Sequence, residues 1–243
     1  RGEREEETFV QTLTESIVTA NSLDTHQASP RPPIANVCFT HFGDHEQTAT
    51  HFFRRTVETG VEIGTAVSEA RGLTKLPPSE KVPLALVERL LGTKVSLRSS
   101  TSPEWRTMKG HQYGPSVKAS LLYGTEGLKK AGFGLIAAVG QGSRDEPCFL
   151  KLHYRPKNKP EGTKKLSLIG KGVILDTGGL SLKTDGQMER MHYDMAGAAT
   201  VAGVFRLAVE KNLAVELVAQ NQHRTPAGDD HPDASSLTRV GFQ

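Results

Sequence analysis

The sequence predicts an α/β protein whose sheet is mainly parallel and flanked by helices. From Phe133 onward, segments typical of strands alternate with segments typical of helices. Residues 166–169 and 173–175 are apolar runs with the pattern of buried strands. The small residues Ala-Gly-Ala-Ala at 196–199 would let the first turn of a helix pack tightly against that sheet. Ligands of such sheets bind beyond the carboxyl ends of the strands, so charged residues there are candidates for a functional site.

Residue patterns place the remaining elements. They predict helices over residues 9–20, 45–73, 83–91 and 117–130. Short apolar runs predict strands over residues 34–42, 93–97, 133–139, 148–154 and 213–219. Pro77 and Pro78 must end the second helix, because proline lacks the N–H that a helix interior requires. Stretches at 22–33 and 155–164 are rich in polar residues, proline or glycine and predict loops.

Composition excludes several classes of protein. The 243 residues carry a formal net charge of +3, without a basic stripe interleaved with aromatic residues, which argues against nucleic-acid binding. No run approaches the length of about 18 apolar residues that a membrane span needs. The two cysteines, Cys38 and Cys148, are far apart and fit a reducing, cytoplasmic location. The charged first residues, without an initiating methionine, indicate a piece of a longer protein.

Four charged residues stand out within the predicted sheet and helix start: Lys171, Asp176, Lys183 and Asp194. An unpaired buried charge costs several kcal/mol, so these residues need partners. The two carboxylates are hard oxygen ligands suited to a divalent cation. A lysine can also bind a metal once its amine has lost a proton, and a neighbouring dication lowers the pKa of that amine. The alternative is two buried Lys–Asp ion pairs that tie strand to helix.

The spacing of these residues resembles a family signature. Residues 171–183 read KGxxxDTGGxxxK, and residues 191–199 read MxxDMxGAA. Together they resemble the core signature of the leucyl (cytosol) aminopeptidase family. The resemblance implies that Lys171, Asp176 and Asp194 are ligands of divalent metal ions, Zn or Mn, of which the complete family site holds two. It also implies that Lys183 is the electrophilic catalyst, and that Met191, Lys183 and Asp194 contact the substrate.

The resemblance carries further expectations about the whole protein. It implies a metallopeptidase that releases N-terminal amino acids from peptides and that assembles as a homo-hexamer. It also implies a remnant of an N-terminal α/β domain with its linker over residues 1–52 and a partial catalytic domain over residues 53–243. We expect residues 220–243 to be an irregular tail, because they are polar and lack periodicity.

A second acidic motif of the family, Asn-Thr-Asp-Ala-Glu-Gly-Arg, does not occur in the 243 residues. Its Asp and Glu complete the two-metal site, so we expect the site here to be incomplete and to hold at most one metal weakly. The acidic and histidine residues of the tail predict a solvated segment, with adventitious ion binding as the alternative. Two further hypotheses remain open. The chain is a catalytically inactive relative that serves as a binding or assembly subunit, or it is a fragment without a stable fold.

Overall fold

The computed structural model describes residues 2–21, 36–37, 48–95, 105–109, 111–184, 186–220 and 240–242. The chain divides into two compact units, residues 1–72 and 73–243. The sequence predicts a boundary earlier, between residues 52 and 53. Helix α2 (Thr48–Lys75) runs through that position, and the predicted domain bounds stay a prediction.

The helices described in the first unit are α1 (Gly2–Ala20) and α2 (Thr48–Lys75). The last three residues of α2, 73–75, belong to the second unit. Two glycines of α2 allow close packing against α1: a Cβ at Gly60 would lie 2.7 Å from the Cβ of Thr14, and one at Gly64 would lie 2.8 Å from that of Val18. The predicted helices at 9–20 and 45–73 are confirmed, and α2 ends before Pro77 as expected. Most of the predicted strand at 34–42 and of the loop at 22–33 lies outside the described residues.

The second unit begins with a 3₁₀ turn, η1 (Pro78–Glu80), and the helix α3 (Pro83–Leu91). Proline is favoured at the first helical position, because the N–H that it lacks would have no partner there. Gly92 ends the helix in the left-handed conformation, with a φ of 63°. The structure therefore confirms the predicted helix at 83–91. The described residues of the predicted strand at 93–97 are not in a strand.

A sheet forms the centre of the second unit. Its strands are β1 (Arg106–Met108), β2 (Val117–Tyr123), β3 (Cys148–Tyr154), β4 (Lys165–Ile169), β5 (Glu216–Gln220) and β6 (Val240–Phe242). The strand order is β1-β2-β3-β5-β4, and β6 pairs with β3 beside β5. Of the pairings among described strands only β4 with β5 is parallel. The α/β class is confirmed, but a mainly parallel sheet is wrong for the described residues.

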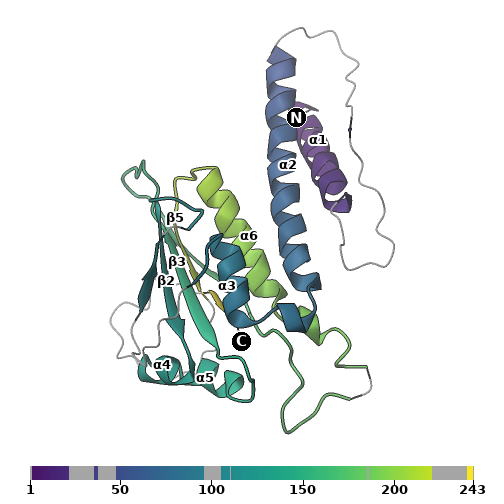
Figure 1. The fold of residues 1–243 in the computed structure, drawn as a ribbon. Coiled ribbons are helices and arrows are strands. Elements are labelled where there is room, and N and C mark those ends of the chain that lie inside the picture. Colours follow the sequence, from purple (N-terminus) through teal and green to yellow (C-terminus); the bar gives the residue numbers. More distant parts are fainter. Residues whose placement is uncertain are drawn as a thin grey trace. The chain divides into compact units, whose positions relative to one another are not determined.

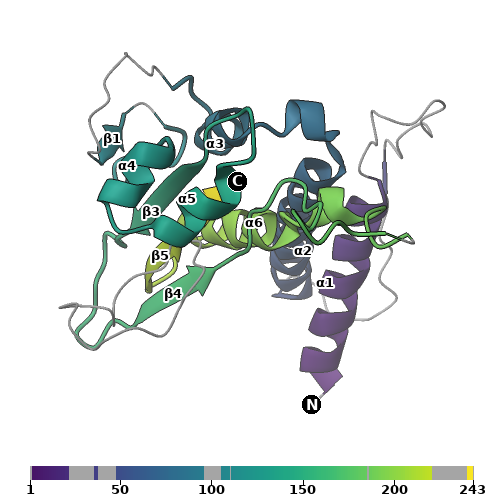
Figure 2. The same cartoon turned by 90° about the horizontal axis from the view of Figure 1, so that it is seen from below.

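Helices cover both faces of this sheet (Figure 1). On one face α3 packs on β3, and α6 (Ala196–Glu210) packs on β4 and β5. On the other face the short helices α4 (Thr125–Lys130) and α5 (Gly134–Gly140) lie together at one end of β2 and β3, as Figure 2 also shows. They bury a cluster of Leu122, Leu128, Ile136, Ala137 and Phe149. No helix among the described residues is long and apolar enough to span a membrane.

Two predicted elements have the wrong type. Residues 117–123 of the predicted helix at 117–130 form β2, and only 125–130 are helical. Most of β2 is buried on both faces, so its sequence lacks the alternation that marks a strand. The predicted strand at 133–139 is α5 instead, because a short apolar run fits a buried helix as well as a strand. These two errors explain the wrong strand directions. Because the sequence pattern does not predict β2, the expected elements alternate between strand and helix, which is typical of a parallel sheet.

The signature region also departs from its predicted strands. Residues 165–169 form β4, but 173–175 belong to the connection that follows it. The prediction of a buried β4 is wrong, because Leu166 and Ile169 are 51% and 56% exposed. The tail prediction is corrected at one point: residues 240–242 form β6, whereas residues 221–239 lie outside the described part of the chain.

A charged group is buried at the base of β5. The Glu216 side chain accepts hydrogen bonds from Lys159 Nζ and from His153 Nε2, each at 2.8 Å, and Glu216 is only 4% exposed. The hydrogen bond from Lys159 is the largest cause that lowers the pKa of Glu216, to about 2, and the one from His153 adds to it. The carboxylate is therefore ionised in the folded protein far below the pH at which an exposed glutamate takes up a proton.

We expect acid to destabilise the second unit through Glu216. Its pKa is depressed on folding, so its contribution is fully present above the ordinary glutamate pKa of 4.5 and is lost as the pH falls toward 2. The loss amounts to about 3 kcal/mol in the free energy of unfolding. In Glu216→Gln the unfolding free energy should be lower at neutral pH and should depend less on pH. Urea unfolding, followed by the fluorescence of Trp105, the single tryptophan, measures this.

Glu126→Gln is the matched control, since Glu126 is exposed and forms an ion pair with Lys129 on the same helix. It should unfold like the unsubstituted chain at every pH. An equal acid dependence in the Glu216 and Glu126 variants would contradict the assignment.

Candidate active site

The candidate site depends on a backbone contact between Gly170, which follows β4, and Gly197, in the first turn of α6. A Cβ on Gly170 would lie 2.3 Å from the carbonyl oxygen of Gly197, and one on Gly197 would lie 2.8 Å from the amide nitrogen of Lys171. Only glycine fits at such separations. The N–H of Ala198 donates to the carbonyl of Lys171 at 2.8 Å, which fastens the helix to the end of the strand. The tight packing predicted for residues 196–199 is confirmed.

This contact brings together Lys171, at the carboxyl end of β4, and Asp194, two residues before α6. Lys171 Nζ lies 2.7 Å from Asp194 Oδ2. The Asp194 side chain is 18% exposed, whereas that of Lys171 is 47% exposed. Asp194 Oδ2 itself is buried and accepts no hydrogen bond of good geometry from the described residues. Among the described residues, the ammonium of Lys171 is therefore the group that compensates the charge of this oxygen.

Asp176 and Lys183 lie on the connection that follows. The N–H of Gly178 donates to Asp176 Oδ1 at 2.9 Å, and Lys183 Nζ lies 3.2 Å from Asp176 Oδ2. The N–H of Lys183 donates to the carbonyl of Thr177, and this hydrogen bond closes the turn that contains Gly178. Gly178 has a φ of 87°, and a Cβ there would lie 2.2 Å from the carbonyl oxygen of Ser181, so glycine is required.

The charge of Asp176 is stabilised from several sides. The Gly178 N–H is the largest cause that lowers the pKa of Asp176, and the hydrogen bond and charge of Lys183 lower it further. The charge of Lys171 acts in the same direction, which links the two ion pairs electrostatically. The structure thus brings Lys171, Asp176, Lys183 and Asp194 into one electrostatic cluster.

Both ion pairs of the alternative interpretation are present, but their side chains are partly exposed rather than buried. Exposed pairs typically contribute only about 0–1 kcal/mol, so ion pairing alone gives little reason for this arrangement. Two carboxylates and one amine provide some, but not all, of the ligands that a divalent cation takes. No group of three or more His, Cys, Asp or Glu residues placed to hold a metal occurs in the described parts of the chain. Metal binding by Lys171, Asp176 and Asp194 stays a prediction.

Met191 lies on a 3₁₀ turn, η2 (Met191–Tyr193), directly before Asp194. The N–H of Asp194 donates to the Met191 carbonyl at 3.3 Å, and this hydrogen bond joins the two residues in one turn. The Met191 side chain is partly buried. Its predicted contact with substrate stays a prediction.

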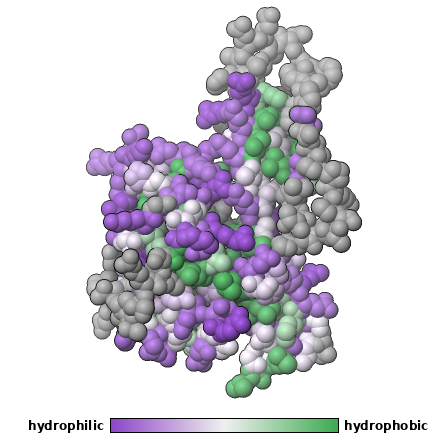
Figure 3. Space-filling model, viewed as in Figure 1, coloured by the Kyte–Doolittle hydropathy of each residue, from purple (hydrophilic) through white to green (hydrophobic). Residues whose placement is uncertain are grey.

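The connection that carries Asp176 and Lys183 also exposes apolar side chains. Leu175, Leu180 and Leu182 are 42%, 111% and 61% exposed. Figure 3 shows this apolar surface in green at the bottom of the view. The charged cluster thus has apolar surface beside it.

Sequence reasoning missed Lys81. The residue is completely buried, and its ammonium donates to the carbonyl of Thr74, at 2.9 Å, and to the carbonyl of His192. Burial lowers the pKa of Lys81. Lys81 thus ties the end of α2 to the turn that carries Met191 and leads to Asp194. No motif marks it; the one sequence signal is a lysine directly before the apolar start of α3.

The catalytic-domain model of the cytosol aminopeptidase family matches residues 69–235. A probable cytosol aminopeptidase of Mycobacterium ulcerans is 32% identical over 194 residues, which cover 78% of this chain and 33% of that protein. One of Photorhabdus laumondii is 29% identical over 238 residues, which cover 96% of this chain and 42% of that protein. The chain therefore spans about a third to two fifths of the length of these relatives.

Solved structures support the same relationship. The bottromycin maturation enzyme BotP in complex with Mn is 25% identical, with a TM-score of 0.65, and the match covers 94% of this chain and 41% of that one. A leucine aminopeptidase of Caenorhabditis elegans is also 25% identical, with a TM-score of 0.63 and coverage of 86% and 37%. Both matches bear out the α/β fold.

The glycine contact predicts the effect of a single methyl group. In Gly170→Ala the added Cβ would meet the Gly197 carbonyl, so strand and helix must separate. We expect a loss of about 2 kcal/mol or more in the free energy of unfolding, measured by urea titration. Gly134→Ala is the matched control, because a Cβ at Gly134 has nothing within 4 Å. It should change stability little or raise it. Equal stability of the two variants would contradict the contact.

Proposed function

The chain belongs to the cytosol aminopeptidase family, and on that premise we propose that it carries part of a metal-dependent aminopeptidase site. The reaction would release the N-terminal amino acid of a peptide by hydrolysis. One observation carries the proposal: the contact between Gly170 and Gly197 brings Lys171 to 2.7 Å from Asp194, and the charge of Lys171 also lowers the pKa of Asp176.

Lys171, Asp176 and Asp194 would hold a divalent cation, Zn or Mn. Manganese is present in the related BotP structure. When bound, such a cation would polarise the peptide carbonyl and lower the pKa of a water molecule beside it. Asp176 is already held in its ionised form by the Gly178 N–H and by Lys183, so it can act as a ligand without first losing a proton.

Lys183 is the residue of the cluster best placed to act on substrate. Its side chain is 26% exposed, and its backbone is fixed by the hydrogen bond to Thr177. An ammonium in this position would donate a hydrogen bond to the peptide oxygen as negative charge develops there. The carboxylate of Asp194 would accept a hydrogen bond from the free amine of the substrate. Met191, on the adjoining turn, would contact the first side chain.

The family resemblance implies that the complete site holds two cations, and Lys171, Asp176 and Asp194 would supply ligands for one. We therefore propose that these 243 residues hold at most one metal, and weakly. The wider protein would be cytoplasmic and would form a homo-hexamer, as the family resemblance implies. The relatives from Mycobacterium ulcerans and Photorhabdus laumondii are named as cytosol aminopeptidases, which supports the location.

A second candidate function is a catalytically inactive relative that serves as a binding or assembly subunit. The observation in its favour is that no cluster of three acidic, histidine or cysteine ligands lies among the residues that the structure describes. The two candidates differ in what they predict for the whole protein, which would turn over peptides only under the first.

Metal binding tests the assignment of Asp176. Asp176→Asn keeps the shape of the side chain and removes its charge, so affinity for Mn²⁺ or Zn²⁺ should fall about tenfold or more while the fold persists. Equilibrium dialysis measures the affinity, and circular dichroism checks the fold. Asp145→Asn, the same change away from the cluster, should bind metal like the unsubstituted chain. Unchanged affinity in Asp176→Asn would remove Asp176 from the site.

Turnover tests whether the site is complete. We expect the 243-residue chain to cleave a leucine anilide no faster than background with added Mn²⁺ or Zn²⁺, because one cation cannot hold both the water and the carbonyl. Lys183→Ala, assayed in parallel, should be equally inactive. Turnover that disappears in Lys183→Ala would contradict the partial site and would show that other residues or a second copy complete it.

A further inference from the structure

A second group of charged residues lies on β2 and β3, away from the signature. Lys118 stands opposite His153 in the antiparallel register of the two strands. The N–H of Arg155 donates to the carbonyl of Ser116 at 2.9 Å, which continues the pairing past the strand ends. Residues two apart on a strand face the same way. Ser116, Lys118, His153 and Arg155 therefore form a two-by-two set on one face of the sheet.

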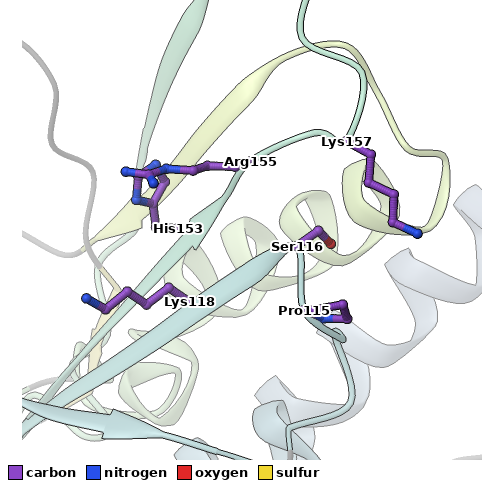
Figure 4. Close-up of a pocket in the computed structure, with 6 residues that line it drawn as sticks. All are labelled: Pro115, Ser116, Lys118, His153, Arg155 and Lys157. Atoms are coloured by element: carbon purple, nitrogen blue, oxygen red, sulfur yellow. The ribbon is translucent and has the colours of Figure 1, made fainter.

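These residues line a pocket with a volume of about 380 Å³, together with Pro115 and Lys157 (Figure 4). Figure 4 shows the side chains of Lys118, His153 and Arg155 extending to the same side of the strands. Lys118, Arg155 and Lys157 are exposed. None of the three has a carboxylate within ion-pair distance among the residues that the structure describes.

A carboxylate that contacts the pocket residue His153 already has a cationic partner outside the pocket. Glu216 accepts a hydrogen bond from His153 through one oxygen and forms an ion pair with Lys159, at 2.8 Å, through the other. Glu216 therefore has little charge left to offset the three cations. The same hydrogen bond holds the His153 ring in place, so the wall of the pocket is rigid. Burial is the main cause that lowers the pKa of His153, and the charge of Arg155 adds to it.

We propose that this pocket binds a compact anion of phosphate chemistry, either inorganic phosphate or the phosphate group of a small phosphomonoester. The guanidinium of Arg155 can bind two phosphate oxygens at once, and Lys118, which extends to the same side in Figure 4, supplies a point charge. The hydroxyl of Ser116 is a further donor at the edge of the pocket. A nucleic-acid surface fits less well, because the unpaired cations are gathered in one small pocket and the chain's net charge is only +3.

Calorimetric titration of the whole chain at low ionic strength tests the proposal. The probes are inorganic phosphate and phenyl phosphate, each expected to bind once per chain. Arg155→Gln and Lys118→Gln should each weaken binding about tenfold or more, as for loss of a charge-assisted hydrogen bond. Lys130→Gln, at the exposed end of α4, removes the same charge outside the pocket and should leave binding unchanged. Tighter binding of phenyl phosphate than of inorganic phosphate would identify an ester as the ligand class.

Several results would overturn the proposal. Binding within twofold of the unsubstituted chain in Arg155→Gln would remove the pocket as the site, provided that circular dichroism shows the variant folded. An equal loss in Lys130→Gln would mean that only the overall charge attracts the anion. Binding of a single-stranded oligonucleotide but of neither small phosphate would make the group part of a polyanion surface instead.

Discussion

The candidate site depends on a backbone contact in which neither partner has room for a side chain. Gly170 and Gly197 touch, and the hydrogen bond from Ala198 to Lys171 fixes the strand end against the first turn of α6. Asp194 stands directly before that helix, so the same contact sets its distance from Lys171. Side chains at positions 170 and 197 would therefore change the distance between Lys171 and Asp194.

Around that contact, the remaining charges are held by local backbone structure. The Gly178 turn presents an N–H to Asp176 and returns the chain so that Lys183 faces the same carboxylate. Lys81 contributes from the start of the unit, where its buried ammonium holds the carbonyl of His192 two residues before Asp194. The candidate site is therefore assembled from two segments: the β4–α6 connection, which includes the η2 turn, and the loop before α3.

The sequence predicts the parts of this structure that depend on interactions between residues close in the chain. It does not predict the parts that depend on contacts between distant residues. The spacing of Lys171, Asp176, Lys183 and Asp194 identifies a site because all four lie on one continuous segment. Helices with clear periodicity or proline boundaries, such as α3, are predicted correctly. By contrast, β2 and α5 are short and mostly apolar, and only tertiary packing decides between strand and helix there. The phosphate pocket and Lys81 escape prediction for a related reason. Lys118 meets His153 only through strand register, and Lys81 meets His192 only across the folded unit.

We propose that Lys171, Asp176 and Asp194 converge on one cation position. Paramagnetic broadening of amide signals by substoichiometric Mn²⁺, in nuclear magnetic resonance spectra of the chain, tests this. Because broadening falls steeply with distance from the ion, signals of residues 170–172, 176–178 and 194–196 should disappear first and together. Broadening of only one of these three segments, or first broadening at acidic residues elsewhere such as Glu126 or Glu146, would contradict it.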